Sequence, residues 1–163
     1  MNKTKRLVTL SVVVALAMVL SYLERLLPEL PIPGMKLGLP NIAVIFALYK
    51  MGKCESLIIS IIRVILVSLL FGSPVSFWYS LAGATLSLVL MILLKSLTPL
   101  NTVTVSIVGG ISHNVAQICV ASILLETNIV TYYLPFLIIA GTVAGVVIGI
   151  AGAMLVKRVK IKW

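Results

Sequence analysis

A single arginine interrupts one of the most apolar stretches of the sequence. Arg63 stands in the middle of SLIISIIRVILVSLLFG, where its close neighbours are aliphatic residues and serine. If this stretch crosses a membrane, the charge costs a few kcal/mol or more unless it is paired or hydrated. Arg63 could bind an anionic group of a ligand, pair with a carboxylate such as Glu24, or extend toward the membrane surface. The sequence leaves these roles open and makes Arg63 a candidate substrate contact.

Three further polar residues stand close together in another apolar stretch, GGISHNVAQICV. His113 and Gln117 are four positions apart and therefore share one face of a helix, with Asn114 beside them. Gly110 lies one turn earlier on the same face, where its missing side chain leaves room. These side chains could orient a ligand, or they could form hydrogen bonds between helices worth about 0.6–2 kcal/mol each.

A third polar group lies around a proline-rich stretch, PELPIPGMKLGLP, whose four prolines exclude regular helix. Glu24 and Arg25 precede it, near a membrane surface where charges are also tolerated for structural reasons. Lys36 and Asn41 lie at its end and could close a binding pocket. The complete set of predicted substrate-binding residues is Arg63, His113, Asn114, Gln117, Lys36, Asn41, Glu24 and Tyr79.

The sequence contains no pattern typical of a catalytic site or a metal site. There is no Asp, and His113 has no acid or cysteine at ligand spacing. Ser112 directly precedes His113, but adjacent positions on a helix do not face each other. A phosphate loop is absent as well, because Gly52-Lys53 is followed by cysteine rather than Ser or Thr. We therefore expect no catalytic residue, no metal, no cofactor and no enzymatic activity.

The elements that hold these residues are predicted from composition and hydropathy. Of 163 residues, 61% are hydrophobic and only 10% are charged, against about 25% charged in ordinary soluble domains. Mean hydropathy is +1.21. We expect an all-α polytopic membrane protein that forms one integral membrane domain over residues 1–163. The six predicted transmembrane helices lie at residues 7–27, 38–51, 55–72, 75–94, 103–125 and 130–156.

The formal net charge of +9 has a simpler explanation than nucleic-acid binding. With six spans, most cations fall on one side of the membrane, which the positive-inside rule makes the cytoplasmic side. Both termini are therefore expected in the cytoplasm, and residues 7–27 are expected to remain as a first helix. The ten cations on this side are Lys3, Lys5, Arg6, Lys50, Lys53, Lys95, Lys157, Arg158, Lys160 and Lys162.

Rows of small residues allow helices to approach closely in lipid. Gly141, Gly145 and Gly149 form such a row in the last predicted helix, and it could serve packing within the chain or docking to a partner. The first predicted helix carries two shorter rows. They are Ser11 with Ala15 and Ala17 with Ser21.

Four stretches, in this order, resemble a bacterial family known as heptaprenyl diphosphate synthase component I or Gx transporter. They are PIPGMKLGLPNIAVIFALYKMG, RVILVSLLFGSPVSFWYSLAG, SHNVAQICVA and YYLPFLIIAGTVAGVVIG. That family is similar to the substrate-binding S components of energy-coupling factor (ECF) transporters. The similarity implies six helices that capture a vitamin or other nutrient outside the cell. It also implies a transmembrane coupling protein and two cytoplasmic ATPases as partners.

The resemblance leads to one main hypothesis and one alternative. The chain is expected to be an S subunit in the bacterial cell membrane that binds a small anionic or amphipathic nutrient, isoprenoid-like or vitamin-like. S components commonly dock through an A-x-x-x-A pattern in helix one, and here only the mixed Ser/Ala rows are present. The alternative is a membrane subunit associated with a polyprenyl diphosphate synthase. Without Asp-rich motifs, that subunit would be non-catalytic.

Overall fold

The computed structural model describes residues 3–27, 38–127 and 129–160, and within these ranges the chain is helical without any strand. Helix α1 spans Lys3–Leu26, α2 Asn41–Lys50 and α3 Lys53–Phe71. Helix α4 spans Pro74–Leu97 and α5 Thr102–Leu124; a short 3-10 helix, η1 (Ile129–Tyr133), leads into α6 (Leu134–Arg158). The predicted all-α class is confirmed, with six α-helices close to the predicted ranges.

Five of these helices have the length and apolar composition to cross a membrane, namely α1, α3, α4, α5 and α6 with its 3-10 extension. The chain is therefore a multi-pass membrane protein by length and composition. Helix α2 has ten residues, which is about 15 Å of helix against roughly 30 Å of hydrocarbon. Residues 38–51 thus do not form a full crossing helix on their own, and the sixth predicted span is not confirmed.

Local sequence explains where the helices begin. Ser73 caps α4 through a reciprocal capping box with Ser76, and Pro74 occupies the first turn, where its missing N–H is not needed. Asn101 caps α5 by accepting a hydrogen bond from the backbone N–H of Thr104 at 2.8 Å. Between α2 and α3, Gly52 has φ +134°, a conformation that favours glycine.

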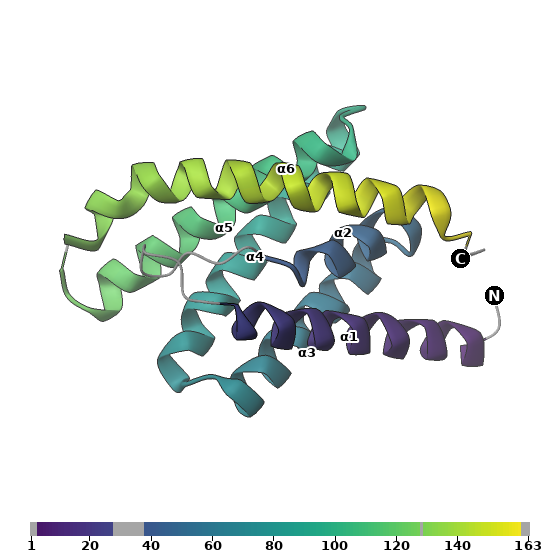
Figure 1. The fold of residues 1–163 in the computed structure, drawn as a ribbon, viewed down its shortest axis with the longest axis horizontal. Helices are drawn as coiled ribbons and strands as arrows, with labels where there is room; N and C mark the ends of the chain where they lie inside the picture. Colours follow the sequence, from purple (N-terminus) through teal and green to yellow (C-terminus); the bar gives the residue numbers. More distant parts are fainter. Residues whose placement is uncertain (1–2, 28–37, 128, 161–163) are drawn as a thin grey trace.

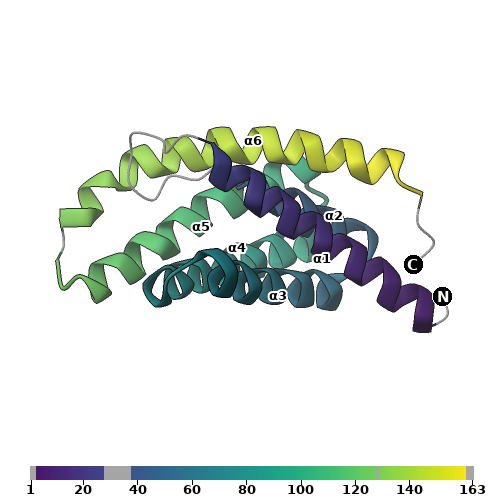
Figure 2. The ribbon, with the colours of Figure 1, turned by 60° about the horizontal axis from the view of Figure 1, so that its bottom comes forward.

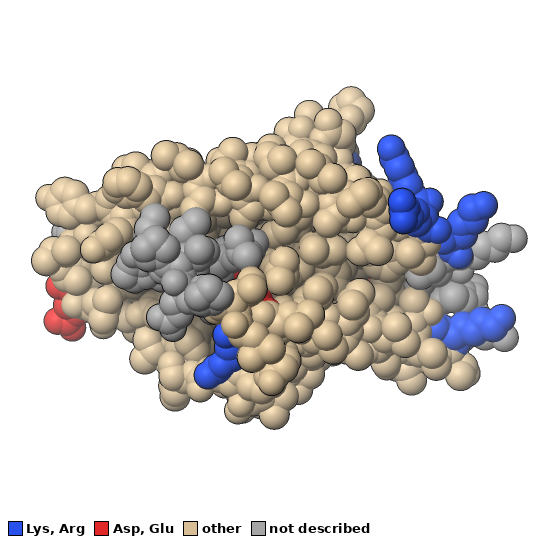
Figure 3. Space-filling model, viewed as in Figure 1, with Lys and Arg blue, Asp and Glu red and all other residues tan. Residues whose placement is uncertain are grey.

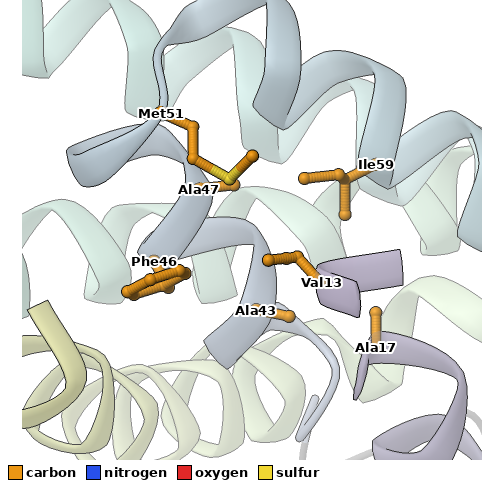
Figure 4. Packing of buried hydrophobic residues seen from close by; sticks show 7 residues of the cluster. All are labelled: Val13, Ala17, Ala43, Phe46, Ala47, Met51 and Ile59. Atoms are coloured by element: carbon orange, nitrogen blue, oxygen red, sulfur yellow. The ribbon is translucent and has the colours of Figure 1, made fainter. Parts of the chain in front are cut away.

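Helix α2 lies inside the bundle and is apolar on all sides (Figures 1 and 2). Residues 43–48 are all buried, as expected for a helix without a polar face. On one side α2 packs against Val13 and Ala17 of α1 and Ile59 of α3 (Figure 4). On the other side its Val44, Ile45 and Leu48 pack against α4, α5 and α6. The short helix therefore joins the amino-terminal and carboxy-terminal halves of the bundle.

The glycine row of α6 faces α5. A Cβ on Gly141 would lie 2.8 Å from the carbonyl oxygen of Gly110, and one on Gly145 would lie 2.6 Å from Cα of Ile107. A Cβ on Gly149 would similarly come within 2.7 Å of Cα of Val103. These distances leave no room for a side chain, so the row serves packing within the chain.

The two ends of the described chain lie at the same end of the molecule (Figure 1). Lysine and arginine side chains gather at this end, as the space-filling view shows (Figure 3). This arrangement agrees with the predicted grouping of the terminal cations. The cytoplasmic location of the termini stays a prediction.

Candidate functional site

The start of α2 is held in place by a carboxylate from another helix. Oε1 of Glu24, near the end of α1, accepts hydrogen bonds from the backbone N–H groups of Gly38 and, at 3.3 Å, Leu39. Gly38 has φ +75°, which an L side chain adopts only with strain, and its carbonyl accepts from the N–H of Asn41 at 2.8 Å. Glu24 therefore positions the backbone that leads into α2.

Arg63 lies on α3, within range of an electrostatic interaction with the carboxylate of Glu24. Its Nε is buried and has no hydrogen-bond partner, and within the described chain the guanidinium forms no ion pair with Glu24. The carboxylate is instead engaged by backbone N–H groups. A half-buried arginine whose Nε has no acceptor retains donors that an anionic ligand could use.

The neighbouring polar residues of α1 have a structural role. Arg25 donates a hydrogen bond to the carbonyl oxygen of Phe71 at the end of α3, and its guanidinium carbon lies 5.8 Å from the centre of the Phe71 ring. The ring of Tyr22 also contacts Phe71 in a tilted arrangement, with 5.8 Å between ring centres and 42° between ring planes. These contacts join the ends of α1 and α3.

A small cavity of about 30 Å³ lies on the other side of the start of α2. Its polar lining comes from Asn41 of α2, Ser87 of α4, and Ser106, His113 and Asn114 of α5. The rest of its wall is glycine and aliphatic or methionine side chains. This volume holds about two water molecules, far less than the roughly 300–1,000 Å³ of typical small-molecule pockets.

The polar residues of α5 pack against neighbouring helices, and some of them also line the cavity. Asn114 donates from Nδ2 to the carbonyl oxygen of Leu137 on α6 at 2.7 Å, a buried bond between helices. His113 lines the cavity and also packs on α4 at Gly83, where a Cβ would lie 2.8 Å from its Cε1. Gln117 packs on Gly83 as well, with its Cγ 3.0 Å from that Cβ position. Asn114 thus forms a hydrogen bond between helices, which was one of its two predicted roles.

Two cavity residues were not predicted from the sequence. Ser87 and Ser106 are 4% and 3% exposed, and their hydroxyl groups form no hydrogen bond with other described residues. A signal for Ser87 existed, because Gly83 and Ser87 are four residues apart and form a short row of small residues on one face of α4. Such rows mark faces where helices approach closely and small polar groups become buried.

The family model of heptaprenyl diphosphate synthase component I matches residues 13–155. The chain belongs to this family. No curated protein and no solved structure matches it.

This member of the component I family brings only some of its predicted site residues together. Asn41, His113 and Asn114 line the cavity, whereas Arg63 and Glu24 lie with the α1–α3 side of the start of α2. Gln117 and Tyr79 do not line the cavity. Gln117 packs on Gly83, and Tyr79 lies one helical turn before Gly83 on α4. Lys36 lies outside the described residues.

The two small rows on α1 differ in exposure. Ser11 and Ala15 are exposed, whereas Ala17 is fully buried and Ser21 is 9% exposed, its hydroxyl donating to the carbonyl of Ala17 at 2.7 Å. A partner could therefore reach Ser11 and Ala15 but not the other two in this conformation. Within the described residues there is also no group of three or more His, Cys or Glu side chains placed to hold a metal ion.

Proposed function

We propose that this chain is the substrate-binding subunit of an ECF-type importer and captures a small anionic or amphipathic nutrient. The observation that carries the proposal is Arg63. It lies within a helix long enough to cross a membrane, its Nε is buried without a partner, and the carboxylate of Glu24 is engaged by the backbone of Gly38. Charged residues of this kind inside a membrane commonly mark the path or site of a polar solute.

The ligand would be recognised by groups on both sides of the start of α2. Arg63 would bind an anionic group such as a carboxylate or phosphate, with charge-assisted hydrogen bonds. On the other side, Asn41 and the hydroxyl groups of Ser87 and Ser106 would orient a second polar group, and aliphatic walls such as Ile148 would contact an apolar part. Glu24 would act as a positioning residue that fixes Gly38 and Leu39 rather than as a ligand contact.

Ligand binding would require a conformational change. The cavity has room for about two waters, so a nutrient-sized molecule enters only if the helices around Gly38 move apart. The difference in affinity for the open and closed arrangements would then drive the change. Because the sequence has no phosphate loop, ATP hydrolysis would be supplied by partner chains, namely a coupling protein with two ATPases.

Native mass spectrometry of the purified chain tests ligand binding. We expect a co-purifying small molecule with wild type, its loss with Arg63→Ala, and partial recovery with Arg63→Lys. Lys53→Ala is the matched control, since Lys53 is an exposed cation on the same helix. If folded Arg63→Ala retains as much ligand as wild type, Arg63 does not bind the ligand and has a structural role.

Transport is tested separately. In vesicles that contain only this chain we expect binding without accumulation, and accumulation only when the coupling protein, the ATPases and ATP are added. Concentrative uptake by the chain alone contradicts the proposal.

The family description favours one other function, that of a non-catalytic membrane subunit for a polyprenyl diphosphate synthase. Such a subunit needs a surface for a soluble enzyme. The connections on the predicted cytoplasmic side are short, with Met51 and Gly52 between α2 and α3 and residues 98–101 between α4 and α5. Affinity purification decides between the two: a co-purified synthase supports this alternative, and a coupling protein with ATPases supports the importer.

A further inference from the structure

Five cations from opposite ends of the sequence form one surface, which we name the basic end. Its residues are Lys3, Lys5, Lys157, Arg158 and Lys160, and all five are exposed. The first two lie in the first turn of α1, and the others lie at or just after the end of α6. The space-filling view shows lysine and arginine gathered at this end of the molecule (Figure 3).

Packing brings the two segments to the same place. Leu10 and Val14 of α1 and Leu155, Val156 and Val159 at the end of α6 all pack against the buried cluster on one side of α2. Both ribbon views place the start of α1 and the end of α6 at the same end of the molecule (Figures 1 and 2). The grouping of cations is therefore a consequence of the folded core.

The charges of the basic end are not neutralised within the described chain. Glu55, which is 6% exposed, pairs with Arg6, and Lys95 donates to the carbonyl oxygen of Leu48 at 2.5 Å. None of the five basic-end cations forms an ion pair with a described residue. The first turn of α1 contains no acidic residue, so Lys3 and Lys5 also face the positive end of the helix dipole, which disfavours cations.

Apolar side chains lie directly next to these cations along both helices. Leu7 and Val8 of α1 are 66% and 57% exposed, and Ile150 and Met154 of α6 are 48% and 50% exposed. Such a surface matches a phospholipid, whose phosphate group would meet the cations and whose acyl chains would meet the apolar side chains. Clusters of basic residues next to membrane helices bind anionic headgroups in this way.

We propose that the basic end binds the phosphate groups of anionic phospholipids in the leaflet that it faces. The headgroup contacts lysine and arginine from both chain ends, and the acyl chains lie along the exposed aliphatic faces of α1 and α6. The bound lipid thereby relieves the mutual repulsion of the five cations. This inference does not depend on which nutrient the protein carries.

The test uses the purified, delipidated full chain in detergent. Phosphatidylglycerol and phosphatidylcholine with identical acyl chains are titrated, and bound lipids are counted by native mass spectrometry. Wild type should bind phosphatidylglycerol tightly and phosphatidylcholine weakly. The double variant Lys157→Gln/Lys160→Gln should weaken phosphatidylglycerol binding by roughly 10-fold or more, and salt should weaken it further in wild type.

The control is Lys50→Gln/Lys53→Gln, which removes the same charge from the α2–α3 region. It should leave phosphatidylglycerol binding near the wild-type value. Equal binding of the two lipids by wild type, or equal loss in both double variants, would overturn the proposal. Capture of an acidic soluble protein without any preference between the lipids would assign the surface to that protein instead. Circular dichroism verifies that both variants are folded.

Discussion

Helix α6 and helix α1 are attached to the bundle in opposite ways. Helix α6 rests on α5 through backbone atoms, with Gly110 and Gly141 in direct contact. Helix α1 buries only Val13, Ala17 and Ser21. Leu10 and Val14 add partly buried apolar contacts, and the ring of Tyr22 contacts Phe71. Polar side chains near the two ends of α1 form its remaining attachments to neighbouring elements.

The polar attachments of α1 occur near both of its ends. Arg6 pairs with Glu55 near one end, and near the other Glu24 holds Gly38 and Leu39 while Arg25 bonds to Phe71. A side chain can change partner with a rotamer change, whereas an interface of backbone atoms cannot slide without losing close contact. Any movement that enlarges the site is therefore expected on the α1–α2 side, with α5 and α6 as a fixed frame.

The largest expected effect tests the backbone contact. In Gly110→Ala the new Cβ would lie 2.4 Å from the carbonyl oxygen of Gly141, so α5 and α6 must separate. We expect a loss of about 3 kcal/mol in unfolding free energy, at the upper end of overpacking effects. Thermal or denaturant unfolding in detergent measures it.

Gly152→Ala on α6 is the control for this prediction. Its Cβ would meet a side-chain methyl group, Cγ2 of Ile45, at 2.9 Å rather than backbone. This contact is longer than the one at Gly110 and involves one side chain rather than the backbone of a neighbouring helix, so the loss should be smaller than for Gly110→Ala. Equal losses would show that backbone contact is not what distinguishes the α5–α6 interface.

The next effect tests the polar attachment of α1 to α2. Glu24→Ala removes the acceptor for the N–H groups of Gly38 and Leu39, and hydrogen bonds to charged groups contribute about 1.5–3 kcal/mol. We expect destabilisation of roughly 2 kcal/mol and more rapid hydrogen exchange at Gly38 and Leu39. Glu126→Gln, at an exposed acid after α5, should change neither. Unchanged exchange at Gly38 would refute a positioning role for Glu24.

A smaller effect is expected at the other end of α1. Arg6 and Glu55 form an ion pair in which the arginine side chain is 53% exposed and the glutamate side chain 8% exposed. Because water screens the exposed partner, a double-mutant cycle with Arg6→Gln and Glu55→Gln should give a coupling of about 0.5–1 kcal/mol. Glu55→Gln alone should be tolerated better than Arg6→Gln, which leaves a buried carboxylate unpaired. A coupling above 2 kcal/mol would contradict the comparison.

Hydropathy was sufficient to predict the helices but not the depth of α2. The apolar run around residues 38–51 fits either a crossing helix or a buried one, since both are apolar on all sides. The structure has a ten-residue helix in the centre of the bundle. The backbone that leads into it is held at Gly38 by the distant Glu24, a tertiary contact that sequence periodicity does not contain.

Residues of the candidate site could be predicted where a strongly polar side chain interrupts an apolar stretch of the sequence. Asn41, His113 and Asn114 stand out in apolar stretches, and all three line the cavity. Ser87 and Ser106 do not stand out, because serine is common in membrane helices and most often bonds to its own backbone. The separation of Arg63 from the cavity could not be predicted either, since it depends on how α3 rotates against α1.

The smallest effect on stability is expected at Ala15, in the exposed one of the two small rows of α1. Ala17 is fully buried, so Ala17→Leu should destabilise the chain by about 1–3 kcal/mol through overpacking. Ala15 is exposed, and Ala15→Leu should change stability by less than about 0.5 kcal/mol. If Ser11 and Ala15 dock a coupling protein, Ala15→Leu should nevertheless prevent co-purification with it, because close helix contact needs small residues. Normal co-purification of a folded Ala15→Leu variant would exclude this face of α1 as the docking surface, while the stability difference between the two substitutions would still report how α1 packs.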